Sequence, residues 1–153
     1  MIKLLTKNTE ETKKIGAELA ADLQGGEILA LSGELGAGKT TLIQGLAGGL
    51  GIKEAVTSPT FILLSLYKLP KTLRQIKYLA HVDAYRLKNS DEALGVGLTD
   101  YLAKPDTVTV IEWAEKFEKI LKNYQTKNIY IKSFSPTNRE IIISESKQSD
   151  SKH

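Results

Sequence analysis

The segment Gly33-Glu34-Leu35-Gly36-Ala37-Gly38-Lys39-Thr40 constrains this chain more than any other part of its sequence. Its spacing, Gly-x-x-x-x-Gly-Lys-Thr, is that of a phosphate-binding loop, or P-loop, which joins a strand to a helix. A nearly continuous apolar run at 27–32 precedes the loop and predicts a strand buried on both faces. Helical apolar spacing over 41–50 follows it. The sequence therefore predicts both neighbours that the motif requires.

The residue types in this loop indicate the chemistry of the predicted site. The glycines let successive backbone N–H groups point at phosphate oxygens, and the helix adds the positive end of its dipole. Lys39 is placed to reach the β- and γ-phosphates, and the Thr40 hydroxyl to bind Mg²⁺. We therefore predict that the chain binds a nucleoside triphosphate with Mg²⁺. The loop residues expected to contact the nucleotide are Leu35, Gly36, Ala37, Gly38, Lys39, Thr40 and Thr41.

The rest of the chain alternates helical and strand patterns. Asn8 and Thr9 can cap a helix predicted at 8–23. Further strands are predicted at 60–67, 79–85, 107–111, 128–134 and 140–144, short helices broken by glycine at 91–101, and a longer helix after Trp113. These patterns predict an α/β fold: one P-loop NTPase domain at 1–144 with a mixed, mostly parallel sheet, flanking helices and a hairpin. The polar tail, 145–153, is predicted to be disordered.

Composition limits the remaining classes. The 153 residues are 41% hydrophobic, contain no Cys and include no apolar run long enough to span a membrane, so we expect a cytoplasmic protein without disulfides or thiolate metal sites. The net charge of +3 permits an RNA partner but does not indicate one. The segment from Lys68 to Lys77 has four cations and no acid, and we predict a solvated connection between two strands there.

A P-loop enzyme also needs an acid at the end of a neighbouring strand, to hold Mg²⁺ and to orient the attacking water. Glu112 ends the strand predicted at 107–111, and Asp83 ends another, so both are candidates, and the sequence does not decide which of them activates water. His81 is predicted to be a strand histidine with a local hydrogen bond. The segment Thr57 to Phe61 fits an ordinary loop or a switch-like loop beside the γ-phosphate.

The class of nucleotide follows from motifs that the sequence lacks. Ala103-Lys104-Pro105-Asp106 lacks the leading amide or hydroxyl of the Asn/Thr-Lys-x-Asp motif of a GTPase, and Asp83-Ala84-Tyr85-Arg86 lacks the glycine of its Asp-x-x-Gly switch. The three arginines are not clustered as in the lid of a small-molecule kinase. ATP with hydrolysis is therefore favoured. A small-molecule or protein kinase and a non-catalytic nucleotide-binding module stay open as alternatives.

Four motifs in order resemble the bacterial TsaE (YjeE) family, whose members are ATPases required for making threonylcarbamoyladenosine in tRNA. They are the glycine loop, Ser58-Pro59-Thr60-Phe61, His81-Val82-Asp83-Ala84-Tyr85-Arg86-Leu87 and Ile111-Glu112-Trp113. The resemblance extends from about Thr9 to Ile143. It implies a P-loop fold with an unusual strand order and slow ATP hydrolysis. It also implies a complex with the TsaB and TsaD proteins, which modify the adenosine beside the anticodon, and tRNA contact through that complex.

The resemblance also implies roles for individual residues. Lys39 and the loop backbone would bind phosphates, and Thr40 and Glu112 would hold Mg²⁺. Lys39, Asp83, Glu112 and Thr60 are the expected catalytic residues. Thr9 and Asn138-Arg139 match positions near the base or ribose. The chain departs from the family in its long basic segment, in its polar tail, and at Asn138, where the family often has Gly.

Overall fold

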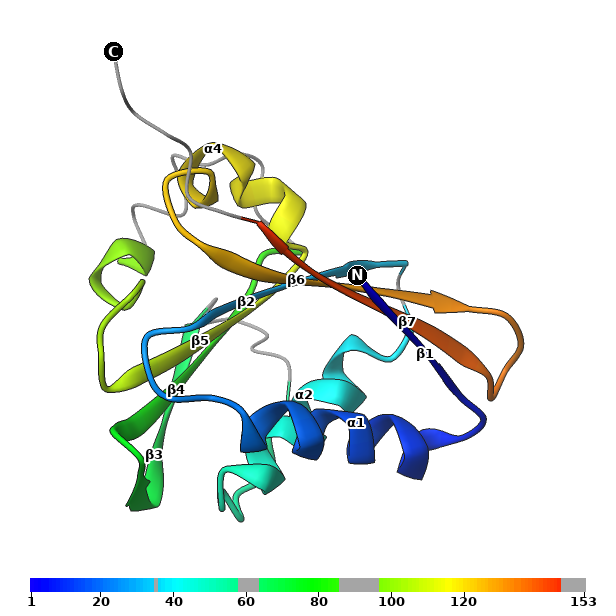
Figure 1. The fold of residues 1–153 in the computed structure, drawn as a ribbon, viewed down its shortest axis with the longest axis horizontal. Coiled ribbons are helices and arrows are strands. Elements are labelled where there is room, and N and C mark those ends of the chain that lie inside the picture. Colours follow the sequence, from blue (N-terminus) through cyan, green and yellow to red (C-terminus); the bar gives the residue numbers. More distant parts are fainter. Residues whose placement is uncertain (35, 58–63, 86–96, 147–153) are drawn as a thin grey trace.

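The computed structural model describes residues 1–34, 36–57, 64–85 and 97–146, and within them seven strands form one sheet in the order β1-β7-β6-β2-β5-β4-β3 (Figure 1). The strands are β1 (Ile2–Thr6), β2 (Ile28–Gly33), β3 (Leu64–Leu73), β4 (Ile76–Asp83), β5 (Thr107–Glu112), β6 (Thr126–Ser133) and β7 (Arg139–Ser146).

The sheet is mixed, as predicted. The four central strands β6, β2, β5 and β4 run parallel, whereas β3, β7 and β1 each pair antiparallel with a neighbour. All six residues of β5 are buried, which explains its continuous apolar and threonine sequence, because a central parallel strand is covered on both faces. The register pairs Glu112 at the end of β5 with Leu31 of β2 and Asp83 of β4, so these strand ends meet at one edge of the sheet.

Helices cover both faces of the sheet (Figure 1). On one face lie α1 (Thr9–Ala21) and α2 (Lys39–Gly49), which form the larger core with side chains such as Leu46 and Val110. On the other face lie η1 (Leu98–Asp100), η2 (Ala114–Phe117) and α4 (Glu118–Leu121), with Phe117 fully buried. The predicted cap is confirmed, because the Asn8 side chain accepts a hydrogen bond from the backbone N–H of Glu11 at 2.8 Å.

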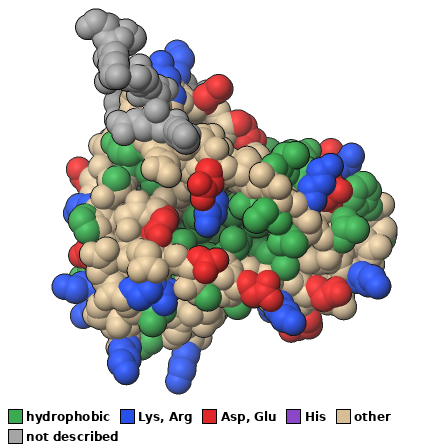
Figure 2. Space-filling model, in the orientation of Figure 1, with side chains coloured by type: hydrophobic (Ala, Val, Ile, Leu, Met, Phe, Trp, Pro, Cys, Tyr) green, Lys and Arg blue, Asp and Glu red, His purple; other side chains and the backbone are tan. Residues whose placement is uncertain are grey.

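The strand β1 was not predicted. It pairs with β7 in the register Ile2↔Ile143 to Thr6↔Arg139, and its alternation is too short to stand out in the sequence. The space-filling view shows hydrophobic side chains gathered over the part of the molecule where Figure 1 places β1 and β7, with side chains of both charges around them (Figure 2). Leu5 is among the exposed apolar residues, at 73%.

The cations of the basic segment are exposed, as predicted, but the segment is a loop only at its tip. Strand β3 continues to Leu73 and β4 begins at Ile76, so this segment forms most of a hairpin. Leu69 and Ile76 within it are buried in the larger core. The guanidinium of Arg74 donates hydrogen bonds to the backbone carbonyls of Ala20 and Leu23 at the end of α1. The prediction rested on the number of cations in the segment, which gives no information about the buried apolar side chains and hydrogen bonds found there.

Two further boundaries differ from the prediction. The helix predicted after Trp113 is a 3-10 turn followed by a single α-helical turn, and β7 continues to Ser146, past the predicted boundary at 144. Of the short helices predicted at 91–101, residues 91–96 lie outside the described part of the chain, and 98–100 form a 3-10 turn.

Candidate nucleotide site

The glycine loop lies at the carboxyl end of β2 and leads directly into α2. Gly36 and Gly38 have φ angles of 78° and 106°, in the left-handed region that favours glycine. Gly38 precedes the first turn of α2, whose free N–H groups carry the positive end of the helix dipole. The free backbone N–H groups at this helix start can therefore bind an anion, as the motif predicts.

Lys39 is held inside the loop by hydrogen bonds to its backbone. Its Nζ donates to the carbonyl oxygens of Gly33 at 2.5 Å and Glu34 at 3.0 Å. The ammonium also lies 4.0 Å from the centre of the Trp113 ring, a cation–π distance, and the residue is only 5% exposed. Burial lowers the pKa of Lys39, while the negative charges of Glu112, Glu115 and Asp83 raise it. The Lys39 ammonium thus lies against the loop backbone and is influenced by the negative charges of three acidic residues.

Thr40 and Glu112 face each other across the site, although 72 residues separate them in sequence. The Thr40 hydroxyl donates to Oε1 of Glu112 at 3.1 Å. The other carboxylate oxygen, Oε2, lies 2.7 Å from Nε2 of His81 on β4. Both oxygens of the Glu112 carboxylate therefore have partners on α2 and β4.

Asp83 lies beside Glu112 at the end of the adjacent strand. Burial raises the pKa of Asp83, and the negative charge of Glu112 raises it further. The backbone N–H of Tyr85, which donates to Oδ1 at 3.0 Å, acts in the opposite direction together with the charges of His81 and Lys39. The result is a carboxylate that accepts a proton more readily than an ordinary aspartate.

These groups surround a hollow of about 360 Å³ at the edge of the sheet. Its lining comes from the loop, the start of α2 and the ends of β4 and β5: Gly36, Gly38, Lys39, Thr40, Thr41, Asp83, Tyr85, Glu112 and Trp113. The rings of Tyr85 and Trp113 lie 5.2 Å apart, centre to centre, and form one wall. The lining combines a cation, two carboxylates and hydroxyls, which suits a phosphate with a bound cation.

A narrower hollow of about 120 Å³ lies on the other side of the loop and shares Gly38 and Thr41 with the first. Thr9 at the start of α1 lines it, as does Arg139 at the start of β7. Asn138 does not line it, and its side chain accepts a hydrogen bond from Thr137 instead. Of the predicted pair, Arg139 is the residue next to the loop.

Arg139 reaches the loop from the far end of the sequence. Its guanidinium donates to the carbonyls of Ser135 at 2.9 Å and Asn138 at 3.1 Å, and lies 3.5 Å from the carbonyl oxygen of Gly36. Arg139 was predicted to lie near the base or ribose, whereas Tyr85, which lines the larger hollow, was part of a family motif without a predicted role. Trp113, which follows Glu112 in the third of the family motifs after the loop, lies in the wall of the hollow.

Two predicted site residues, Leu35 and Thr60, lie outside the described part of the chain. The side-chain oxygens of Thr40 and Glu112 fit a magnesium ion by their chemistry. Mg²⁺ prefers hard oxygen ligands and is bound by one or two carboxylates together with substrate phosphates. Thr40 and Glu112 provide a hydroxyl and a carboxylate 3.1 Å apart next to the phosphate-binding loop.

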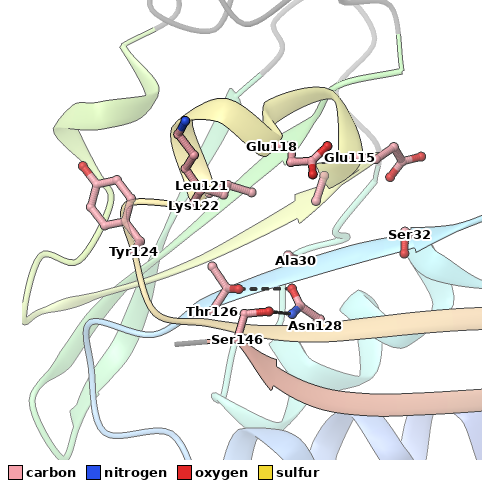
Figure 3. A pocket seen from close by; sticks show the side chains of 11 residues that line it. Ala30, Ser32, Glu115, Glu118, Leu121, Lys122, Tyr124, Thr126, Asn128 and Ser146 are labelled. Atoms are coloured by element: carbon pink, nitrogen blue, oxygen red, sulfur yellow. Dashed lines mark hydrogen bonds between the residues drawn. The ribbon is translucent and has the colours of Figure 1, made fainter. Parts of the chain in front are cut away.

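A further hollow, of about 410 Å³, lies on the opposite face of the sheet (Figure 3). Its floor includes Asn128, which bonds to Thr126 and Ser146, and its wall includes Glu115 and Glu118. Among the described residues that line it, none was assigned to nucleotide binding from the sequence, and Lys122 is the one cation. Most of the described residues that were predicted to contact the nucleotide instead line the two hollows beside the loop.

Comparisons with known proteins find a matching family model and similar relatives. The family model described as threonylcarbamoyl adenosine biosynthesis protein TsaE matches residues 6–141. Proteins described as tRNA threonylcarbamoyladenosine biosynthesis protein TsaE are similar to the chain: the one from Bacillus subtilis is 40% identical over 92% of this chain and 83% of its own length, and the one from Treponema pallidum 34% over 93% and 99%.

The fold has a match among solved structures. The crystal structure of Bacillus subtilis YdiB superposes with a TM-score of 0.75 and 36% identity, over 93% of this chain and 83% of that one. This confirms the predicted P-loop NTPase fold. Within the described residues, no helix has the length and apolar composition needed to cross a bilayer. The chain therefore belongs to the TsaE family, the proteins of tRNA threonylcarbamoyladenosine biosynthesis.

Proposed function

We propose that this protein binds Mg²⁺–ATP in the hollow beside the glycine loop, hydrolyses it slowly, and uses its nucleotide state to reset the TsaB–TsaD complex. The observation that carries the proposal is that Lys39 and Thr40 from the loop and Glu112 from the neighbouring strand line one hollow, with Thr40 hydrogen-bonded to Glu112. A nucleotide-binding role follows from the fold and family. Hydrolysis and the partners are the proposed additions.

The loop and its lysine bind the phosphates in this proposal. Lys39 exchanges its bonds to the carbonyls of Gly33 and Glu34 for phosphate oxygens, which accept stronger hydrogen bonds from a cation. Thr40 and Glu112 hold Mg²⁺, which would neutralise charge on the β- and γ-phosphates. The base or ribose extends into the narrow hollow between Thr9 and Arg139.

Asp83 is the residue that we assign to the attacking water. It ends the strand next to Glu112, and its raised pKa makes it a better proton acceptor than an ordinary aspartate. Hydrolysis by the protein alone should be slow, because water is oriented and excluded only partly until a partner covers the site. TsaB and TsaD are the expected partners, and tRNA contact is expected through them.

The test is phosphate release from Mg²⁺–ATP, for the protein alone and mixed with purified TsaB and TsaD. Strong stimulation by the pair is expected, with loss of activity in Lys39→Ala. That variant should bind ATP about 10- to 100-fold more weakly, because a charged hydrogen bond contributes about 1.5–3 kcal/mol. Lys53→Ala, which removes an exposed lysine beyond α2, is the matched control and should behave as wild type. Unchanged ATP affinity in Lys39→Ala would show the loop assignment to be wrong.

The alternatives give different outcomes in the same preparation. Asp83→Asn should bind Mg²⁺–ATP but release phosphate about 100-fold more slowly or worse, the usual loss when a general base is removed. A non-catalytic binding module would show no turnover to lose. A kinase would transfer label from ATP to a product in cell extract rather than to free phosphate.

A further inference from the structure

One buried group near the site has no role in the proposal so far. His81, in the middle of β4, is fully buried, at 0% exposure. Its Nε2 lies 2.7 Å from Oε2 of Glu112, and its Nδ1 has no hydrogen-bond partner among the described residues. A buried polar atom without a partner is unfavourable, so the ring is a poor choice for stability alone. Its single bond, to Glu112, is the contact that needs a reason.

The bond has a defined direction. An ionised carboxylate can only accept hydrogen bonds, so Nε2 of His81 carries the proton and donates to Glu112. Thr40 donates to the other oxygen of the same carboxylate at 3.1 Å. The terminal torsion of a glutamate has a broad range in isolation, and these two donors restrict it. The carboxylate plane is thereby set before any ligand arrives.

His81 is fixed just as firmly itself. Its strand pairs with β5 in the register His81↔Val110, which places the imidazole on the same sheet face as Glu112, two residues further along β5. The side chain is surrounded by the core, so it cannot turn away to solvent. Rigid support behind a ligating carboxylate is what metal sites commonly use, and its loss typically lowers metal affinity about 10- to 100-fold.

We propose that His81 is a positioning residue that orients the Glu112 carboxylate for Mg²⁺ on the nucleotide. The inference rests on the proposed function, since it assigns Glu112 to the ion. His81 is not among the residues that line the hollow, so it would act on the ion only through Glu112. Its substitution should therefore affect the Mg²⁺-dependent part of ATP binding and leave the metal-free part unchanged.

The experiment compares three substitutions at this position. The amide nitrogen of Gln in His81→Gln can reach the position of Nε2, whereas that of Asn in His81→Asn reaches only the position of Nδ1, and His81→Leu has no donor at all. ATP binding is titrated by calorimetry over a series of Mg²⁺ concentrations and again in EDTA. The Mg²⁺ concentration for half-maximal effect should rise about 10- to 100-fold in the Asn and Leu variants and remain near wild type in the Gln variant. Affinity in EDTA should be equal in all.

Thr109→Val is the matched control. Thr109 is also fully buried, on the neighbouring strand β5, and its hydroxyl donates to the carbonyl of Tyr101 at 3.4 Å on the other face of the sheet. It should leave the Mg²⁺ dependence unchanged. If the Leu variant does not fold, the difference between Gln and Asn decides the question. Equal Mg²⁺ dependence in Gln and Asn overturns the positioning role while the proposed function stands. If the wild-type protein binds ATP equally well with and without Mg²⁺, the proposed Mg²⁺–ATP site is wrong, and the role of His81 falls with it.

Discussion

Helices α1 and α2 approach each other through glycines, and this contact gives a sharp test of the fold. A Cβ added at Gly45 of α2 would lie 2.0 Å from the carbonyl oxygen of Lys13 and 2.6 Å from its Cα, where ordinary contacts begin at 3.4 Å. Both obstacles are backbone atoms, which cannot rotate away. In Gly45→Ala the helices must therefore separate by more than about 1 Å, and a gap of that size already forfeits a quarter to a half of each dispersion contact or more.

The expected magnitude combines two opposing effects. Overpacking of a core costs about 1–3 kcal/mol, and a clash with backbone belongs at the upper end. Replacing a helical glycine by alanine returns about 0.5–1 kcal/mol. Gly45→Ala should thus lower the free energy of unfolding by about 2 kcal/mol, and Tm by about 4–8 °C for a chain of this size. Gly48 lies in the same helix with no atom within 4 Å of an added Cβ, so Gly48→Ala should be neutral or stabilising by up to about 1 kcal/mol.

Urea unfolding followed by far-UV circular dichroism, without nucleotide, measures both variants. A second readout is ATP affinity, which should fall in Gly45→Ala because α2 starts at Lys39 while α1 carries Thr9 on the opposite wall of the narrow hollow. Equal changes in stability for the two variants would refute the argument, since they differ only in the space around the new methyl group.

Three further predictions concern stability in the absence of ligand. Burial raises the pKa of Asp83, so the folded protein retains a proton that the unfolded chain releases, and stability is lost as pH rises through that raised pKa. The urea midpoints of wild type and Asp83→Asn should converge below about pH 4 and separate in favour of the variant towards about pH 7. Arg74→Ala should cost about 1–2 kcal/mol in urea unfolding, because it removes the donor to the last carbonyls of α1, while Lys71→Ala, at an exposed position, should change nothing measurable. Leu46→Ala should lower the free energy of unfolding, measured by thermal denaturation, by about 2–5 kcal/mol because Leu46 is 2% exposed. Leu66 is 46% exposed, so Leu66→Ala should lower it far less.

Local patterns were sufficient for the parts of the site that are contiguous in sequence. The glycine loop, the strand before it and the helix after it are specified by backbone conformation and apolar spacing within about 25 residues. The same holds for Glu112 and Asp83, because each simply ends an apolar run and parallel strands end at one edge. Their predicted roles still await the experiments above.

Side-chain contacts between neighbouring strands could not be predicted from those local patterns. Glu112 is hydrogen-bonded to both Thr40 and His81 because β5 lies between β2 and β4 in the sheet. The register of these strands matters as well, since a shift by one residue would turn each side chain to the other face. The partner of His81 was expected to be local, and it comes from the neighbouring strand 31 residues away. Arg139 reaches Gly36 across 103 residues of sequence because β7, which it begins, pairs with β6, and β6 pairs with β2 before the loop.

The sequence by itself determined the phosphate-binding loop, the α/β class and the family resemblance, because these depend on residue types at short, fixed spacings. Only the tertiary structure decided that β1 joins the sheet, that the basic segment is a hairpin whose Arg74 binds the end of α1, and that a buried histidine is hydrogen-bonded to the Glu112 carboxylate. Each of these depends on which distant segments share a core or a hydrogen-bonded edge. Pairing and burial of that kind are set by the packing of the whole chain and leave little trace in any one stretch of it.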